Sequence, residues 1–538
     1  MQDSDRNNRR LSPAILGIYF IGIGFFIVQF LSLSHPTAGF AWLPRYGAHF
    51  HEAKTDAFKE TTHLVTSKYG YDGQFYSQMA LSPTLREEGI EDALVVFNYR
   101  ARRILFSWTA FALGLGQPDW VIQAYSIQNA IFWLMLAAAL LKWFPPNSWQ
   151  NAIRYLGTLY APGMIISATH ALLDGPSLFL IVLGALFIEK QRQAIGSFAL
   201  AMAGLGKETN LLSAVLIPLP QKLRSGSLYR FVGSMAVIAI PIGIWILYVS
   251  QLSGNAEGSA GYRNFNYPFP SWFASLWNNL ATLKAGGLAT WKHTYLLMLV
   301  TLMVQAVYFA IRPQPKSMWW RLGATFGCLT LILGDAVWEG HTGAAIRVAL
   351  PMTLAFNVLL PRTAKALPLL LLVNSLSLSG IAHLVETRVP QPISYLQSAN
   401  PNANLDPDSF VTPRLRFENG WFGVENSETD YWYWSSGKGI IFYSIYHSDA
   451  VPALFEFQFR SLSSRTIDIE LNGVPIESYS YTSPNISQGK AARLLLQPGD
   501  NEIAFITRSP ADSVAGDSRE LAFALYNIRF RLEEGPER

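Results

Sequence analysis

Long apolar runs recur through the first 385 residues of this chain and are absent from the rest. The first run, from Leu11 to Leu33, is long enough to cross roughly 30 Å of hydrocarbon at about 1.5 Å per residue. The further runs lie at about 120–142, 152–169, 175–189, 195–206, 208–220, 231–251, 293–312, 320–338, 344–361 and 366–384. This pattern predicts an all-α polytopic membrane domain, residues 1–385, with about 11 transmembrane helices.

Composition supports a membrane location, since only 14% of the residues are charged, against about 25% in soluble proteins. The net charge of +4 is small and calls for no nucleic-acid partner. The single cysteine, Cys328, lies within an apolar run and excludes both an internal disulfide and a cysteine-based metal site. The first run is too long for a cleaved signal peptide and is interpreted as an anchor.

Basic residues mark every second turn between the apolar runs, which by the positive-inside rule places those turns in the cytoplasm. They are Lys142, Lys190, Arg192, Lys222, Arg224, Arg230, Arg312, Lys316, Arg321, Arg362 and Lys365. This threading predicts a multi-pass protein of the inner (plasma) membrane, with a cytoplasmic N-terminus and a periplasmic or extracellular C-terminal part.

The same threading collects the unusual ionisable residues on the outer side. They are Asp72, His170, Asp174, Lys207, Glu208, Asp335, Glu339, His341 and Arg347. Ionisable groups at membrane depth are costly and usually functional, so we expect one polar cavity that opens outward. The short apolar pieces on either side of Lys207 predict helices broken at a functional depth.

The first outer loop, residues 35–102, contains the octapeptide Tyr69-Gly70-Tyr71-Asp72-Gly73-Gln74-Phe75-Tyr76. Its glycines permit a tight turn, and its aromatics suit a headgroup layer or a sugar ring. An ordinary turn with interfacial aromatics remains the alternative. The loop ends in the basic pair Arg102 and Arg103, before a short apolar piece at 104–116 that fits an interfacial or re-entrant helix. The outer segment 252–292 is either a mobile lid or a packed loop.

From about residue 409 the pattern changes to strand-like alternation, as in Phe455-Glu456-Phe457-Gln458-Phe459, with turn signals such as Asn472-Gly473. We expect a linker at 386–408 and an all-β, jelly-roll-like sandwich at 409–538. Its aromatic segments at 420–425 and 431–434 form either core and packing contacts or a sugar-binding face.

Outside the membrane there is no supply of nucleotide sugars or ATP, and the chain has no glycine-rich phosphate loop, GxSxG or HExxH motif. A group-transfer donor there would be lipid-linked. Displacing phosphate from an anomeric carbon needs a base on the acceptor hydroxyl and cations on the phosphate. Asp72 is the candidate base or metal ligand. Lys207 and Arg347 are candidate phosphate ligands, with Arg102 and Arg103 as second choices.

Each candidate has a structural alternative. Lys207 and Glu208 could form a mutual ion pair. Arg347 could pair with Glu339 or Asp335, and Asp174 could cap a helix. His170 and Asp174 could instead be ligands or acceptor contacts.

The motif Tyr-Asp-Gly-Gln-Phe-Tyr after one span, followed by Tyr-Arg-Ala-Arg-Arg-Ile-Leu, resembles bacterial membrane proteins of the GT-C glycosyltransferase superfamily. Segments 172–176, 205–209 and 339–351 are similar to that group in order and spacing. The superfamily includes oligosaccharyltransferase catalytic subunits, protein O-mannosyltransferases and aminoarabinose transferases. The likeness covers roughly residues 11–385, and the C-terminal region resembles β-sandwich domains appended to some such enzymes.

The resemblance implies a polyprenyl-linked donor, undecaprenyl phosphate in bacteria, and an essential acid in the first outer loop, which falls on Asp72. Substrate contacts would come from Tyr71, Gln74, Tyr76, His170, Asp174, Glu208 and Glu339. Many members carry paired acids in this loop, whereas Asp72 has no acidic neighbour, so the role of a divalent cation stays open.

The sequence thus predicts a glycosyltransferase that transfers a sugar from a polyprenyl phosphate to a glycan, lipid or protein acceptor with inversion. One alternative is a transporter or lipid-linked oligosaccharide flippase, which needs a polar pathway to both faces. Another is a polysaccharide polymerase or ligase acting on diphosphate-linked chains.

Overall fold

The structure is a computed structural model of the 538-residue chain. It describes residues 12–532 except 36–37, 48–49, 51–52, 68–69, 221–225, 253–263, 285–289, 339–343, 390–414, 418–419, 427–429, 446–449, 482–485, 488, 498, 515–516 and 518. The chain divides into two compact units. The first comprises Met1–Ser34, Ala53–Thr61 and Phe75–Arg388, and the second comprises His35–Glu52, Thr62–Gln74 and Val389–Arg538.

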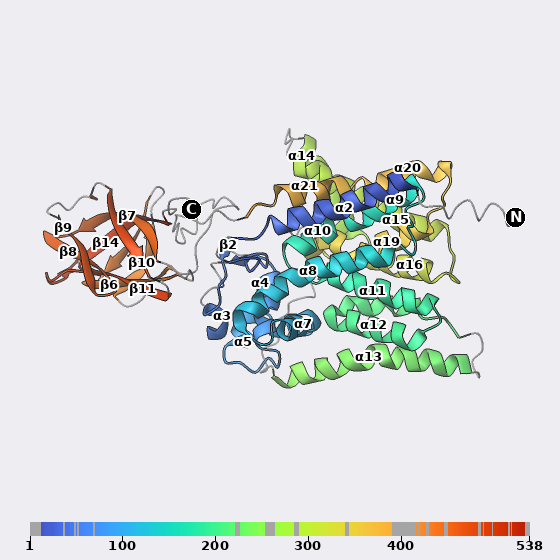
Figure 1. Ribbon diagram of the computed structural model, residues 1–538, viewed down its shortest axis with the longest axis horizontal. Coiled ribbons are helices and arrows are strands. Elements are labelled where there is room, and N and C mark those ends of the chain that lie inside the picture. The colour runs from blue at the N-terminus through green and yellow to red at the C-terminus, as the bar shows by residue number, and fades with distance from the viewer. Residues whose placement is uncertain are drawn as a thin grey trace. The chain divides into compact units, whose positions relative to one another are not determined.

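The first unit is helical (Figure 1). Its helices, including α4, whose first residues belong to the second unit, are α2 (Pro13–Leu31), α3 (Asp56–Lys59), α4 (Gly73–Leu81), α5 (Ile90–Leu94), α6 (Phe97–Arg100), α7 (Leu105–Leu113), α8 (Pro118–Leu140), α9 (Trp149–Leu159), α10 (Pro162–Thr169), α11 (Asp174–Glu189), α12 (Gln193–Gly206), the 3-10 helix η2 (Glu208–Leu216), α13 (Gly226–Leu252), α14 (Pro270–Lys284), α15 (Thr290–Ile311), α16 (Met318–Leu331), α17 (Asp335–Trp338), α18 (Ala344–Val348), α19 (Leu350–Leu359), η4 (Ala364–Ala366), α20 (Leu367–Asn374) and α21 (Ser377–Glu386).

Five segments among the described residues are long and apolar enough to cross a membrane: Pro13–Leu31, Pro118–Leu140, Gly226–Leu252, Thr294–Ile311 and Ala364–Glu386. The count of about 11 spans is not confirmed, because several predicted runs divide into shorter helices. The run at 152–169 breaks between α9 and α10, and the run at 344–361 breaks between α18 and α19. A proline, Pro162 or Pro351, lies at the start of the second helix in each case, where its missing N–H and fixed φ oppose a continuous helix.

Several basic turns meet at one end of the helices. The indole nitrogens of Trp143 and Trp319 both donate to Glu189 Oε1, each over 3.0 Å. Arg362 Nη2 donates to the carbonyl of Trp143 over 3.0 Å. The turns after α8, α11, α15 and α19 therefore lie together, and we call this the basic end. Asp174, at the other end of α11, lies about 24 Å away by helical rise.

Neighbouring helices pack closely along the first unit, with α11 beside α12 and α12 beside α13 (Figure 1). Aromatic stacking holds α2 against the bundle. The Phe26 and Trp133 rings stack with centroids 3.8 Å apart, and the Tyr19 and Tyr155 rings are 4.1 Å apart. The predicted short helix at 104–116 is present as α7. Of the predicted lid at 252–292, residues 253–263 and 285–289 lie outside the described residues, and α14 occupies most of the remainder.

The second unit contains the predicted β domain, built from two five-stranded antiparallel sheets. Their orders are β10-β7-β14-β5-β4 and β3-β6-β11-β8-β9. The strands of this unit are β1 (Tyr46–Gly47), β2 (Val65–Ser67), β3 (Leu415–Phe417), β4 (Trp421–Asn426), β5 (Tyr431–Ser435), β6 (Lys438–Ile445), β7 (Val451–Ser461), β8 (Arg465–Leu471), β9 (Val474–Tyr481), β10 (Lys490–Leu496), β11 (Gly499–Ile506), β12 (Asp512–Ser513), β13 (Glu520–Leu521) and β14 (Phe523–Leu532).

The alternation in the sequence produces the core of this β domain. Phe455, Phe457 and Phe459 of β7 are buried, and their ring centroids lie 5.6 Å, 5.6 Å and 6.2 Å from that of Phe505 of the other sheet. The Asn472-Gly473 turn joins β8 and β9 with both φ angles positive, +52° and +75°, as a tight hairpin requires. The jelly-roll connection stays a prediction. Most of the predicted linker at 386–408 lies outside the described residues.

Candidate active site

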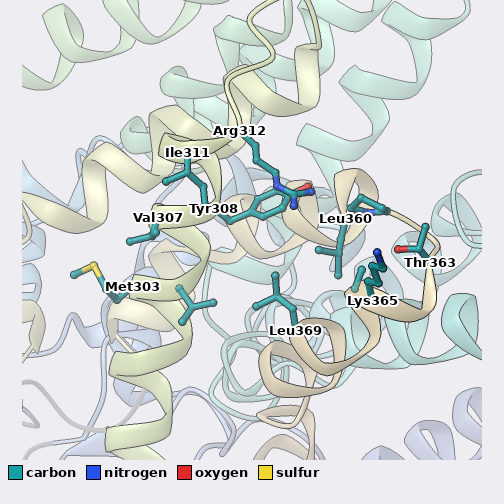
Figure 2. Close-up of a pocket in the computed structure, with 12 residues that line it drawn as sticks. Met303, Val307, Tyr308, Ile311, Arg312, Leu360, Thr363, Lys365 and Leu369 are labelled. Atoms are coloured by element: carbon teal, nitrogen blue, oxygen red, sulfur yellow. The ribbon is translucent and has the colours of Figure 1, made fainter.

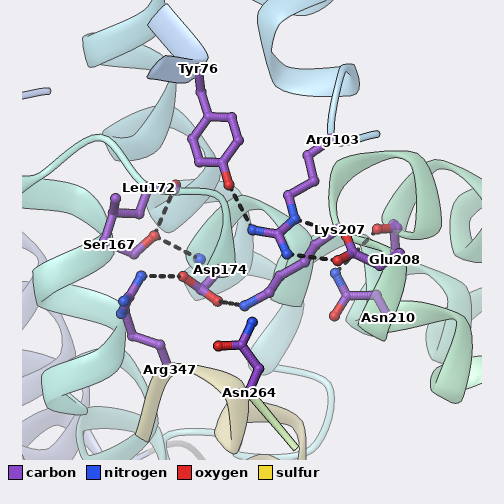
Figure 3. Close-up of polar contacts among 12 residues, drawn as sticks. Tyr76, Arg103, Ser167, Leu172, Asp174, Lys207, Glu208, Asn210, Asn264 and Arg347 are labelled. Atoms are coloured by element: carbon purple, nitrogen blue, oxygen red, sulfur yellow. Dashed lines mark hydrogen bonds and ion pairs between the residues drawn. The ribbon is translucent and has the colours of Figure 1, made fainter. Parts of the chain in front are cut away.

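Asp174 lies at the centre of a buried ion-pair cluster in the first unit (Figure 3). Lys207 Nζ is 2.6 Å from Asp174 Oδ1, and Arg347 Nη1 is 3.0 Å from Asp174 Oδ2. The Asp174 side chain is only 5% exposed. One carboxylate thus bridges two cations from separate segments. Removing one partner from such a buried pair typically costs about 3–5 kcal/mol, because it leaves an uncompensated charge.

The break between α12 and η2 directs two adjacent side chains to different partners. Lys207 has extended backbone angles, φ −162° and ψ 122°, and Glu208 begins η2. Successive side chains of an extended segment point to opposite sides. Lys207 accordingly reaches Asp174, whereas Glu208 reaches Arg103. The predicted break at Lys207 is confirmed. Because of this break, the side chains of Lys207 and Glu208 reach different members of the cluster.

Arg103 makes the second half of the cluster. Its Nε and Nη2 donate to the two carboxylate oxygens of Glu208 over 2.8 Å and 2.6 Å, and its Nη1 donates to the Tyr76 hydroxyl over 2.7 Å. The Tyr99 ring centroid lies 4.3 Å from the guanidinium carbon. Two parallel N–H donors to one carboxylate form the geometry that arginine also uses for phosphate.

Neutral polar groups hold this arrangement. Ser167 Oγ accepts from the Gly175 backbone N–H over 2.8 Å and donates to the Leu172 carbonyl over 3.0 Å, which fixes the start of α11. Asn264 Nδ2 donates to the Tyr99 hydroxyl over 3.2 Å. Sequence reasoning missed all three side chains, Ser167, Tyr99 and Asn264. Asn264 stands in the segment 252–292, for which the sequence predicts either a mobile lid or a packed loop, and Ser167 lies within an apolar run that carries no signal.

The described cluster holds an excess of positive charge. Three cations, Arg103, Lys207 and Arg347, face two carboxylates, Asp174 and Glu208, which leaves one net positive charge. The start of α11 adds the positive end of a helix dipole beside Asp174. The arrangement is suited chemically to bind an anion such as a phosphate group.

Two of the structural alternatives, the Lys207–Glu208 pair and a helix cap by Asp174, are wrong, and the pairing of Arg347 with Glu339 stays a prediction. Lys207 and Glu208 do not pair with each other, for the backbone reason above. Arg347 contacts Asp174, and Asp335 is exposed on α17. Asp174 is the first helical residue of α11, after Leu173 at the N-cap, and its carboxylate binds cations. Glu339 and His341 lie outside the described residues.

Two further candidates of the first unit are His170 and Arg102. Thr169 Oγ1 is 3.1 Å from both His170 Nδ1 and His383 Nε2, and the two imidazole rings stack with centroids 5.5 Å apart. His170 thus joins α10 to α21. Arg102 is half-buried beside Arg103.

The first-loop motif belongs to the second unit up to Gln74. Gly70 has φ +68°, and a Cβ there would approach the Arg45 carbonyl oxygen to 2.4 Å, so this position favours glycine. The Tyr71 N–H donates to that carbonyl over 2.7 Å, and Gln74 Oε1 accepts from the Gly47 N–H over 2.9 Å. Asp72 is half-buried in the turn immediately before α4. The tight turn is confirmed, and the role of Asp72 stays a prediction.

No group of three histidine, cysteine, aspartate or glutamate side chains gathers as a metal site within the part of the chain that the structure describes. Asp72 therefore acquires no set of fellow ligands from the described residues.

The aromatic segments of the β domain divide between two environments. Trp421 packs against the core, with its Nε1 donating to the Ile440 carbonyl over 3.0 Å. Trp432 is half-buried, stacks on Tyr526 with centroids 4.9 Å apart, and donates to Glu425 over 3.1 Å. The core interpretation is confirmed for Trp421, and a sugar-binding role for this domain stays a prediction.

Comparison with known proteins finds no matching family model and no matching curated protein. Among solved structures, the chain is similar to arabinosyltransferase EmbB from Mycobacterium smegmatis at 10% identity and a TM-score of 0.31, covering 97% of this chain and 66% of that one. A Podospora anserina GH26-CBM35 β-(1,4)-mannanase matches at 10% identity and a TM-score of 0.16, over 23% of this chain and 26% of its own. The C-terminal CBM6 of LamC from Zobellia galactanivorans matches at 12% identity and a TM-score of 0.15, over 22% of this chain and 88% of its own. TM-scores of this size do not establish a common fold.

Proposed function

We propose that this chain is an inner-membrane glycosyltransferase that moves one sugar from a polyprenyl-phosphate donor to an extracytoplasmic glycan, lipid or protein acceptor. The observation that carries the proposal is the buried cluster at the start of α11, where three cations face two carboxylates. A chain with several apolar helices can receive a lipid-linked donor laterally from the bilayer, and such a cluster can bind its phosphate.

The cations of the cluster support an anionic donor. A sugar-linked polyprenyl monophosphate carries one negative charge, which Lys207, Arg347 and Arg103 can bind. A transporter would also need exchangeable polar groups at the basic end. There Arg154 and Arg321 donate to backbone carbonyls, and Arg321 Nε does so to Val215 over 2.6 Å.

In the proposed reaction, Lys207 and Arg347 bind the donor phosphate, and Arg103 assists them. Asp72, the candidate base of the first outer loop, takes the proton of the acceptor hydroxyl. The acceptor oxygen forms a bond to the anomeric carbon as the bond from that carbon to the phosphate oxygen breaks. The phosphate leaves with the electron pair, needs no proton, and the anomeric centre inverts.

The test separates donor binding from transfer in full-length protein in lipid nanodiscs. Asp72→Asn should abolish transfer from polyprenyl-phosphate sugars, keep the melting temperature and still bind undecaprenyl phosphate. Lys207→Gln and Arg347→Gln should weaken that binding about tenfold or more, since a charged hydrogen bond is worth about 1.5–3 kcal/mol. Asp56→Asn is the matched control, because its carboxylate in the same loop is 97% exposed. Normal transfer by Asp72→Asn would refute the assignment of the base.

A further inference from the structure

A groove at the basic end of the first unit is used by nothing described above (Figure 2). It lies between the last turns of α15 and the segment from Leu360 to Leu369 that leads into α20, and its volume is about 360 Å³. That volume is near the lower end of the range of about 300–1,000 Å³ for small-molecule sites. The groove can therefore take part of a lipid rather than a whole one.

One wall of the groove is apolar and faces outward from the helix bundle. Met303, Val307 and Ile311 follow one another at spacings of four residues, which places them on one face of α15. Val307 is 45% exposed and Ile311 is 69% exposed. Both belong to the candidate span Thr294–Ile311, so in a membrane their exposed surface would contact hydrocarbon. Leu369 lines the groove from α20.

The rim of the groove is cationic. Arg312 and Lys365 line it together with Thr363, and no carboxylate is among its lining residues. Both cations are exposed, and no ion pair within the described ranges neutralises either of them. The guanidinium carbon of Arg312 lies 5.7 Å from the centroid of the Tyr308 ring. That ring is itself fixed by a 3.3 Å hydrogen bond from its hydroxyl to the Leu359 carbonyl.

We propose that this groove binds an anionic phospholipid of the surrounding membrane, with an acyl chain along α15 and the phosphate between Arg312 and Lys365. A neutral lipid would leave the two cations unmatched, and a soluble anion would leave the apolar wall unmatched. Only an anionic amphiphile complements both. The positive-inside rule assigns this end to the cytoplasm, where anionic lipids concentrate and basic pockets between spans bind their headgroups.

This site is independent of the proposed transfer reaction. Glu189 marks the basic end of α11 and Asp174 marks the other, about 24 Å away by helical rise. The lipid would hold α15 and α20 together at their charged ends. Loss of the lipid should change thermal stability while leaving the ion-pair cluster at Asp174 intact.

Native mass spectrometry of the full chain, released from nanodiscs of phosphatidylglycerol and phosphatidylcholine, tests the proposal. Wild type should retain phosphatidylglycerol in preference to phosphatidylcholine. In the double variant Arg312→Gln/Lys365→Gln, the ratio of retained phosphatidylglycerol to retained phosphatidylcholine should fall about tenfold to thirtyfold, as expected for two cations near an anionic headgroup. Val307→Trp, which fills the groove and keeps both cations, should also lose the bound lipid.

The matched control is Lys190→Gln/Lys316→Gln, which removes two exposed cations of the basic end that do not line the groove. It should retain phosphatidylglycerol as wild type does. Equal retention of the two lipids by wild type, or equal loss in the control and the rim variant, would overturn the proposal. The melting temperature of each variant is measured in the same preparation as its lipid binding. This measurement distinguishes a loss of binding from unfolding of the variant.

Discussion

The two ends of α11 place charge in different ways. At the Asp174 end, buried cations are matched by side-chain carboxylates, as in the Lys207 and Arg347 pairs. At the basic end, the fully buried Arg154 serves the backbone instead: it donates to the Leu360 carbonyl over 3.0 Å and to the Pro361 carbonyl over 3.3 Å. A cation that satisfies the free carbonyls of a helix end is part of the fold. A cation matched by a carboxylate can exchange that partner for another anion.

The largest expected effect comes from breaking the central pair. Asp174→Asn leaves Lys207 and Arg347 facing a neutral amide in a buried site, and the expected loss of unfolding free energy is about 3–5 kcal/mol. The melting temperature of purified protein in nanodiscs, followed by tryptophan fluorescence, measures this loss. Asp56→Asn is again the control. If both variants melt like wild type, the buried pairs do not stabilise this end.

Arg103→Lys sharpens the comparison, because it keeps the charge and removes the two parallel donors to Glu208. We expect binding of undecaprenyl phosphate to weaken about tenfold, or about 1.4 kcal/mol, since a lysine offers a point charge without the fork geometry. Equilibrium binding of the labelled lipid measures the change. Arg86→Lys is the control, since Arg86 lies in the same loop and donates to Tyr248 from an exposed position. Unchanged affinity in Arg103→Lys would remove Arg103 from the phosphate site.

Lys54 offers a third setting for a cation, buried in the first loop against the Phe58 ring, 5.1 Å from its centroid. Burial, with a smaller effect from Lys59, lowers the pKa of the Lys54 ammonium from 10.5 to about 7. The folded chain then binds fewer protons than the unfolded chain between those values, so stability should rise with pH in that window by at most about 1.4 kcal/mol per unit. Lys54→Met should flatten this slope, as melting temperatures at several pH values would show. An unchanged slope would mean that the ammonium is solvated.

The smallest effect is expected at the basic end. Glu189 accepts two indole N–H groups, and Glu189→Gln retains an oxygen that can accept them. We expect a change within about 0.5 kcal/mol for Glu189→Gln and a loss of about 1 kcal/mol for Glu189→Ala. Thermal melts of the two variants side by side test this order. A loss in Glu189→Gln as large as that in Asp174→Asn would contradict the distinction between the two ends.

Periodicity was sufficient to predict the β domain. The alternation from Phe455 to Phe459 appears as one buried face of β7, and Asn472-Gly473 forms the expected hairpin turn. The span count was less predictable, because hydropathy does not register where a proline such as Pro162 divides an apolar run. The length and composition of apolar runs limit the number of possible membrane spans, whereas a break within a helix depends on a single residue.

The charged members of the candidate site were predictable from the sequence, and their pairing was not. Asp174, Lys207 and Arg347 were singled out because ionisable groups are rare in apolar runs. Their pairing depends on the extended backbone at Lys207, which turns its side chain away from Glu208. Ser167 could not be found from sequence, since its role arises only where the start of α11 meets the end of α10.

The 3-10 helix η2 has a mechanical consequence. At about 2.0 Å per residue it spans roughly 18 Å, nearly the 21 Å that the 14 residues of α12 span at about 1.5 Å each. Glu208 is tied to Arg103 at one terminus, and the Leu216 carbonyl accepts from Arg321 over 3.3 Å at the other. The nine residues of η2 thus set the distance between the ion-pair cluster and the basic end. Inserting or deleting a single residue in η2 would shift one anchor by about 2 Å, which is enough to separate either the cluster or the carbonyl contacts.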